Sequence, residues 1–179
     1  MDDLAWETLD SRTSYTCEGF DVVTDDVRLP DGTETEFDYL VEDESAVILP
    51  FTADGRVVVI EEWRQAVGRV NRGLPAGNLE PEESLEAGAR RELAEETGYE
   101  AGEISHMTTV EPANGFADAE FHYVLARECE PTADRSLDYN ESIRVDTTTF
   151  EELVEAARAD ELRDGRSALA VLYYALFEG

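Results

Sequence analysis

Two runs of β-branched and other apolar residues constrain the fold of this chain more than any other feature. They are SAVILPF at 45–51 and RVVVIEEW at 56–63, and the turn signal Asp54-Gly55 stands between them. Runs of this length and composition predict neighbouring strands that are buried on at least one face. Because buried strands must be covered, other parts of the 179-residue chain have to form layers around them.

Hydrophobic periodicity and turn signals predict the order of those layers. Residues 1–14 are polar and predict an arm that docks through Trp6. A hairpin follows, in which two strands flank the turn signal Asp31-Gly32. The chain is then predicted to form strands at 20–29, 34–41, 103–112, 119–128 and, more weakly, 142–150, with helices at 81–98, 150–159 and 166–177. This order predicts an α+β fold in which residues 1–44 and 45–179 form one structural unit.

The charge of the chain limits its partners and its chemistry. There are 43 acidic residues against 14 basic ones, all of them Arg, which gives a formal charge of -29. A charge of this size favours solubility in strong salt and predicts a halophilic source. It argues against a nucleic acid partner, and the lack of lysine excludes Schiff-base and Walker-type chemistry. No membrane span or signal peptide is predicted, so a cytoplasmic location is expected.

The helix predicted at 81–98 is unusually rich in glutamate. Pro81 suits its first turn, and Gly98 is a natural stop at its end. At about 100° per residue, Glu92, Glu95 and Glu96 share one face, where three carboxylates repel one another. A hard cation such as Mg²⁺ would make that face favourable. The spacing alone leaves two interpretations open, a metal site and a solvated acidic face.

The same residues match a known motif. From Gly77 through Glu83 to Arg91-Glu92-Leu93-Ala94-Glu95-Glu96-Thr97-Gly98-Tyr99, the segment resembles the Nudix box, G-x5-E-x7-R-E-U-x-E-E-x-G-U with U apolar. LPAG at 74–77 and EEWRQAV at 61–67 are similar to segments of ADP-ribose pyrophosphatases. Gly73 and Glu62 depart from that pattern, where Glu and Gln are usual. The resemblance implies an α/β/α sandwich with a mixed sheet, a catalytic loop-helix-loop and C-terminal helices.

The resemblance also implies roles for the residues of the box. Glu92, Glu96 and the carbonyl of Ala76 are expected to bind Mg²⁺ or Mn²⁺. Glu95 is expected to be a further ligand or an orienting group with a part in catalysis. A structural brace is expected from Arg91 and Glu83, with Gly98 as the helix stop and Gly77 providing a backbone turn.

Residues outside the box are expected to complete the site. Glu141, in the polar segment LDYNESIRV, is the expected general base, with Glu111, Glu120 and Asp118 as rivals. Arg64 is expected to contact phosphate or ribose, against the alternative of a surface ion pair. Phe116 is expected to stack on a base.

The resemblance implies metal-dependent hydrolysis of ADP-ribose or a related nucleoside diphosphate sugar, giving a nucleoside monophosphate and a sugar phosphate. Two alternatives stay open. One is a Nudix hydrolase of nucleoside triphosphates or NADH-type dinucleotides, and the other is a non-catalytic domain that senses ADP-ribose. Because relatives of this type dimerise through their N-terminal strands, a homodimer is also expected.

Overall fold

The two apolar runs at the centre of the sequence form neighbouring strands, as predicted. They are β4 (Ser45–Thr52) and β5 (Val57–Arg64), which pair antiparallel at Phe51 and Val57. Gly55 has a φ of +80° in the turn between them, a conformation that side chains other than glycine rarely adopt. The β-branched pattern and the Asp-Gly signal therefore identified this hairpin correctly.

The structure, a computed structural model, describes residues 4–179. These residues fall into a smaller unit, up to Glu44 with Val110–Glu120, and a larger unit, Ser45–Thr109 with Phe121–Gly179. Besides β4 and β5, the strands are β1 (Glu7–Thr16), β2 (Asp21–Arg28), β3 (Glu34–Val41), β6 (Arg69–Gly73), β7 (Ala76–Asn78), β8 (Glu103–Val110), β9 (Phe121–Cys129) and β10 (Ile143–Thr148). The helices are α1 (Leu85–Thr97), α2 (Phe150–Arg158), α3 (Gly165–Phe177) and a 3-10 turn, Gln65–Val67.

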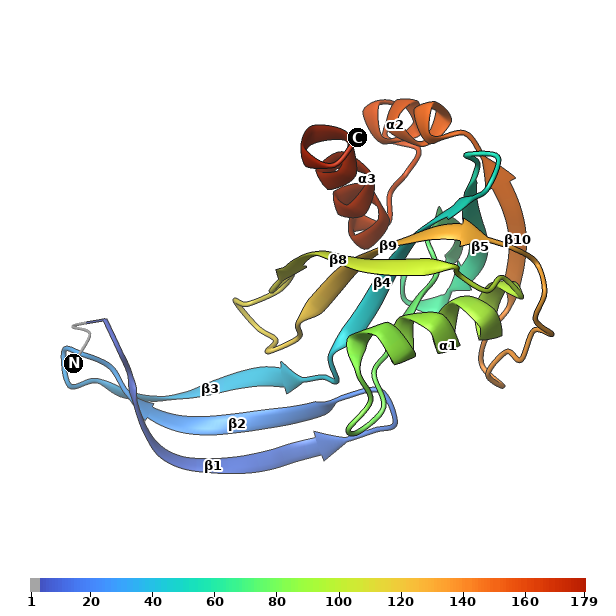
Figure 1. The fold of residues 1–179 in the computed structure, drawn as a ribbon. Helices are drawn as coiled ribbons and strands as arrows, with labels where there is room; N and C mark the ends of the chain where they lie inside the picture. The colour runs from blue at the N-terminus through green and yellow to red at the C-terminus, as the bar shows by residue number, and fades with distance from the viewer. Residues whose placement is uncertain (1–3) are drawn as a thin grey trace. The chain divides into compact units, whose positions relative to one another are not determined.

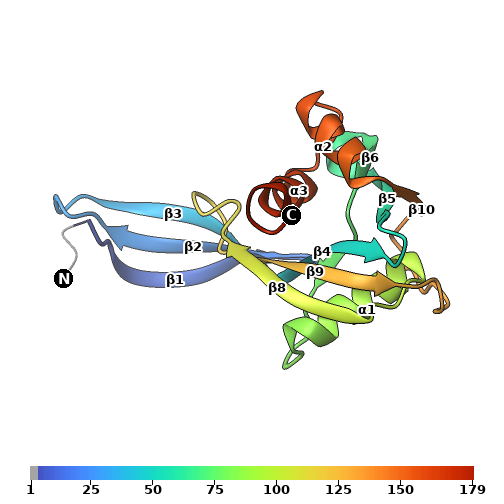
Figure 2. The same cartoon turned by 45° about the horizontal axis from the view of Figure 1, so that its top comes forward.

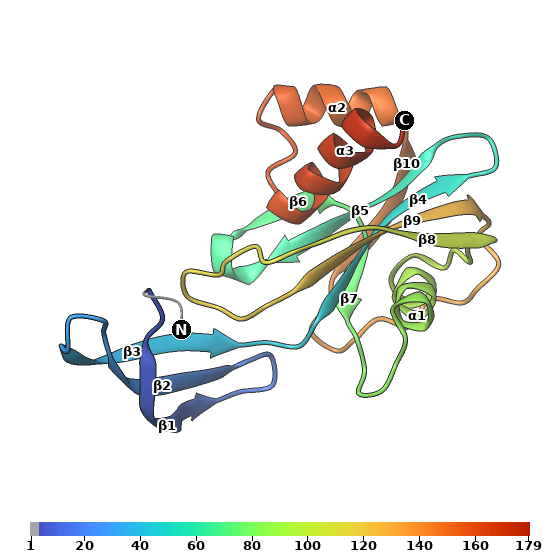
Figure 3. The same cartoon turned by 60° about the vertical axis from the view of Figure 1, so that its left-hand side comes forward.

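The larger unit is built on a mixed sheet. Its strand order is β10-β5-β4-β9-β8, with β6 beside β5 and β7 beside β4. β4 and β9 run parallel, whereas β5 is antiparallel to β10, β4 and β6. Helix α1 lies on one side of the sheet, and α2 and α3 lie on the other (Figures 1 and 3). This is the α+β architecture that the sequence predicted, with helices on both faces.

Strand β4 is buried because both of its faces are covered. Ala46 and Ile48 point to one face and belong to a core that includes Ala89 and Leu93 of α1. Phe51 points to the opposite face, where its ring lies 5.1 Å from that of Tyr174 in α3. Successive side chains of a strand alternate between faces, so β4 packs against α1 on one face of the sheet and α3 on the other.

The smaller unit contains a three-stranded antiparallel sheet in the order β1-β2-β3 (Figure 2). Residues 1–3 of the predicted arm lie outside the described residues, and the rest of that prediction was wrong, because Glu7–Thr16 forms a strand that pairs along β2. Trp6, through which the arm was predicted to dock, packs edge-on against Phe37 with ring centroids 5.6 Å apart. The unit is completed by the 110–120 segment, in which Ala117 bridges to Leu40.

Helix α1 begins later than predicted. Ser84 caps it by accepting a hydrogen bond from the Ala87 amide, and the first helical residue is Leu85 rather than Pro81. Glu82 has a φ of +66°, which places it outside the helix. Gly98 ends the helix with a φ of +77°, as predicted. The other two helices start and end close to their predicted bounds, whereas β6 and β7 were not predicted.

Among residues 4–179, no helix has the length and apolar character needed to cross a membrane.

Candidate functional site

The site forms where β7 meets α1. β7 pairs with β4, which places Ala76 beside Val47 and Gly77 beside Ala46. A Cβ atom added at Gly77 would lie 2.1 Å from the carboxylate carbon of Glu92. The prediction that Gly77 provides a backbone turn was therefore wrong. This glycine lies in strand β7, and its lack of a side chain leaves room for Glu92.

Glu96 is the most deeply buried carboxylate of the box. The residue is 3% exposed, and its Oε2 accepts a hydrogen bond of 3.0 Å from the Ala76 amide. Burial raises its pKa to about 8 in spite of this hydrogen bond, and repulsion from Glu92, Glu141 and Glu62 adds to the rise. The charges of Glu92, Glu141 and Glu62 thus all act on the Glu96 carboxyl group.

Glu92 lies on the same side of α1, with 13% of its side chain exposed. Burial raises its pKa, which a hydrogen bond of 2.7 Å from Arg91 partly offsets. Glu95 differs from these two, because 42% of its side chain is exposed and it lies 3.2 Å from Arg91. The structure therefore brings Glu92 and Glu96 together in a partly buried setting and leaves Glu95 nearer the surface.

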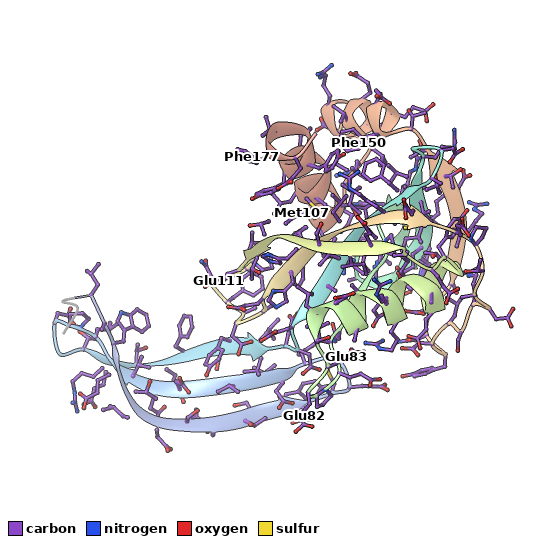
Figure 4. All side chains as sticks on the ribbon, viewed as in Figure 1. Glu82, Glu83, Met107, Glu111, Phe150 and Phe177 are labelled. Atoms are coloured by element: carbon purple, nitrogen blue, oxygen red, sulfur yellow. The ribbon has the colours of Figure 1, made fainter. Side chains whose placement is uncertain are left out.

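Arg91 connects the acidic residues of the box. Its Nε and Nη2 donate to the two carboxylate oxygens of Glu83 at 3.1 and 2.8 Å, and Nη2 also donates to the carbonyl of Asn78 at 2.9 Å. This pairing lowers the pKa of Glu83, as does a hydrogen bond from the Glu80 amide. Figure 4 shows Glu83 just before α1. The expected Arg91–Glu83 brace is present, and it ties the loop to the helix.

Glu141 comes from the loop that precedes β10. It is partly buried, and its Oε2 accepts a hydrogen bond of 2.9 Å from the Asp138 amide. Its charge raises the pKa of Glu62, Glu92 and Glu96. Glu141, one of the four candidates for the general base, therefore acts electrostatically on the glutamates of the box.

Arg64 forms an ion pair with Glu62, in which Nη2 lies 2.7 Å from Oε2. Glu62 is 7% exposed, and burial raises its pKa although Arg64 opposes the rise. In the sequence, Glu62 stands out only as a departure from the family pattern. Strand alternation offered a signal, because Glu62 falls on the same face of β5 as the buried residue Ile60.

Phe116 and the remaining rivals for the base belong to the smaller unit. Phe116 is 59% exposed and lines a cavity of about 450 Å³ together with Trp6, Phe37 and Tyr39. The same cavity is lined by Glu111, Asp118 and Glu120. An aromatic cavity of this size has room for a planar ring, and the stacking role of Phe116 stays a prediction.

The residues of the larger unit fit a divalent cation. Glu92 and Glu96 provide oxygen donors, which hard cations prefer. Burial raises the pKa of both side chains, so the ionised forms are costly unless a positive charge lies beside them. The absence of a side chain at Gly77 gives Glu92 the space in which its carboxylate sits.

Known proteins resemble this chain along most of its length. Residues 42–169 match the model of the NUDIX domain. The chain is 30% identical over 179 residues to an ADP-ribose pyrophosphatase of Bacillus subtilis, covering 99% of this chain and 97% of the relative. It is 28% identical to a methanol dehydrogenase activator of Bacillus methanolicus, covering 86% and 84%. A crystal structure of an ADP compounds hydrolase shares the fold, with a TM-score of 0.84 at 19% identity, covering 95% of this chain and 92% of that one.

Proposed function

The chain belongs to the Nudix family, and from this premise we propose that it hydrolyses the pyrophosphate bond of ADP-ribose or a related nucleoside diphosphate sugar. It is a Nudix pyrophosphohydrolase, and Nudix hydrolases generally use divalent metals. The observation that carries the choice of substrate is the likeness, along almost the whole of both chains, to a relative named ADP-ribose pyrophosphatase. With ADP-ribose, the products are AMP and ribose 5-phosphate.

The proposed metal ligands are Glu92, Glu96 and the carbonyl of Ala76, with Mg²⁺ or Mn²⁺ as the ion. When bound, the ion offsets the negative charge of the pyrophosphate and makes water a stronger nucleophile. The hydrogen bond from the Ala76 amide to Glu96 supports this assignment, because it fixes one ligand beside another. Arg91 also donates a hydrogen bond to Glu92 Oε1, which orients that carboxylate.

Glu141 is the proposed general base, and it takes a proton from the attacking water. Its support is its electrostatic coupling to Glu92 and Glu96. The hydrogen bond from the Asp138 amide orients its carboxylate. Glu95 is proposed to orient the same water or to act as a further ligand, consistent with its greater exposure.

Arg64 and Phe116 are the proposed substrate contacts. Arg64 donates to a phosphate or ribose oxygen, and its ion pair with Glu62 limits the directions in which the guanidinium can point. Phe116 stacks on the base, and its place in an aromatic cavity supports this role.

The proposed setting is the cytoplasm of a halophile. The charge of -29 supports it, because self-repulsion of this size is screened by strong salt. The same charge supports a small substrate rather than a nucleic acid or an anionic membrane surface. A homodimer is also proposed, supported by strand β1, which is exposed along all ten residues. Sedimentation equilibrium in multimolar KCl tests it, and a monomer mass would refute it.

The function is tested by incubating the protein with ADP-ribose in multimolar KCl, with Mg²⁺ or with EDTA, and identifying the products. Mg²⁺-dependent release of AMP and ribose 5-phosphate is expected. If ADP-ribose is not cleaved, a panel of nucleoside triphosphates and dinucleotides follows, and faster cleavage of one of these replaces the proposed substrate. If the folded protein cleaves nothing but binds ADP-ribose, the chain is a sensor rather than an enzyme.

A further inference from the structure

The short turn between β6 and β7 presents Ala76 to the site. The backbone groups of residues 74–76 form hydrogen bonds with three different elements. The Leu74 amide donates to Ser167 Oγ in α3 at 2.8 Å, the Pro75 carbonyl accepts from Ile48 in β4 at 3.0 Å, and the Ala76 amide donates to Glu96 in α1 at 3.0 Å. The position of Ala76 therefore depends on α3 as well as on the helix that carries the box.

Ser167 is fully buried, and its hydroxyl group is held in one orientation. Its proton is donated to Asp164 Oδ2 at 2.5 Å, which leaves a lone pair of the oxygen for the Leu74 amide. Asp164 is the N-cap of α3 and also accepts from the Ser167 amide at 3.3 Å. Arg166 lies beside it, 3.4 Å from Oδ1. A buried hydroxyl group that both donates and accepts a hydrogen bond is held rigidly in place.

Gly73 makes this anchor sterically possible. A Cβ atom at residue 73 would lie 2.8 Å from Ser167 Oγ and 3.1 Å from Asp164 Oδ2. A side chain here would force the Ser167 or Asp164 side chain to shift. The departure from the usual family residue at position 73 thus has a physical reason, which is the close approach of Ser167.

We propose that Ser167, oriented by Asp164, is a positioning residue that sets the affinity of the site for its divalent cation. It acts through the Leu74–Ala76 turn, which places the Ala76 carbonyl and holds Glu96 through the Ala76 amide. This inference rests on the proposed function, in that Ala76 and Glu96 are taken as ligands. Residues that orient metal ligands typically change metal affinity 10- to 100-fold, here by way of a backbone turn.

The test measures Mn²⁺ binding by electron paramagnetic resonance in multimolar KCl, without nucleotide. Ser167→Ala is expected to weaken Mn²⁺ binding about tenfold or more. It should also speed hydrogen exchange at the Leu74 amide, which loses its acceptor. Ser167→Thr keeps the hydroxyl group and is expected to bind Mn²⁺ within about threefold of the wild type. Gly73→Ala disturbs the contact from the other side and should weaken Mn²⁺ binding in the same direction.

Thr149→Ala is the matched control, since it removes a hydroxyl acceptor from the start of α2 in the same unit. It should leave Mn²⁺ binding unchanged. Circular dichroism shows which variants are folded. If Ser167→Ala does not fold, the Mn²⁺ affinity of Gly73→Ala tests the inference instead. If the wild type binds Mn²⁺ and the folded Ser167→Ala and Gly73→Ala variants bind it equally well, this inference alone is overturned. A wild-type protein that binds no Mn²⁺ overturns the metal assignment, and this inference with it.

Discussion

The substitution Gly77→Ala separates the geometry of the site from the stability of the fold. The added Cβ atom would lie 2.1 Å from the carboxylate carbon of Glu92 and 2.2 and 2.3 Å from its oxygens. Non-bonded carbon atoms approach to about 3.5 Å, so the Glu92 carboxylate has to retreat by more than about 1 Å. A displacement of about 1 Å in a catalytic group can cost about 100-fold in rate. We therefore expect kcat/KM to fall about 100-fold.

The stability of the variant should change little. The atoms in the way belong to the end of a flexible side chain, which can rotate, and not to the backbone. Replacing glycine by alanine also reduces the entropy of the unfolded chain, by an amount worth about 0.5 kcal/mol. The expected free energy of unfolding is within about 1 kcal/mol of the wild type.

The assay compares AMP release from ADP-ribose at saturating Mg²⁺ with urea unfolding in the same KCl buffer. Gly19→Ala is the control, because a Cβ atom there meets nothing within 4 Å and the residue lies in the loop between β1 and β2. Activity of Gly77→Ala within a factor of about three of the wild type would show that the position of Glu92 does not matter. A large loss of stability would instead show that the clash reaches the backbone.

Three further predictions concern the charged residues of the box. Glu96→Gln should lower kcat about 100-fold or more, because it removes the charge proposed to bind the metal. The circular dichroism spectrum should stay the same. Near-normal turnover would refute the role of Glu96 as a ligand. Burial raises the pKa of Glu96 from its ordinary value of 4.5 to about 8, so between these two pH values the folded state holds a proton that the unfolded state has lost. Without divalent cations, the free energy of unfolding measured in urea should therefore fall as pH rises through this window, by up to about 1.4 kcal/mol per pH unit. Glu96→Gln should reduce this dependence on pH. An equal dependence in both proteins would contradict a raised pKa at Glu96. Arg91→Lys should cost about 2 kcal/mol of unfolding free energy, because lysine cannot reproduce the paired hydrogen bonds to the charged Glu83. Arg158→Lys, at an exposed ion pair, should cost almost nothing.

Local sequence patterns were enough for most of the secondary structure and for the centre of the site. The runs that became β4 and β5, the Asp-Gly turns and the stop at Gly98 depend on steric preferences of neighbouring residues, which a sequence displays directly. The common face of Glu92 and Glu96 follows from helical geometry. The start of α1 was misplaced, because the hydroxyl of Ser84 is a better cap than the Pro81 turn.

Contacts between distant segments were decided only by the tertiary structure. The sequence marked Gly73 and Glu62 as departures from a family pattern, and the structure shows that Gly73 admits Ser167 and that Glu62 is buried beside Arg64. The room that Gly77 leaves for Glu92 likewise appears only when β7 lies against α1. Residues 73 and 167 approach because the sheet and the helix α3 are folded together. Periodicity and turn signals report on a few neighbouring residues, so they determined the elements of this protein, whereas packing decided which of its side chains meet.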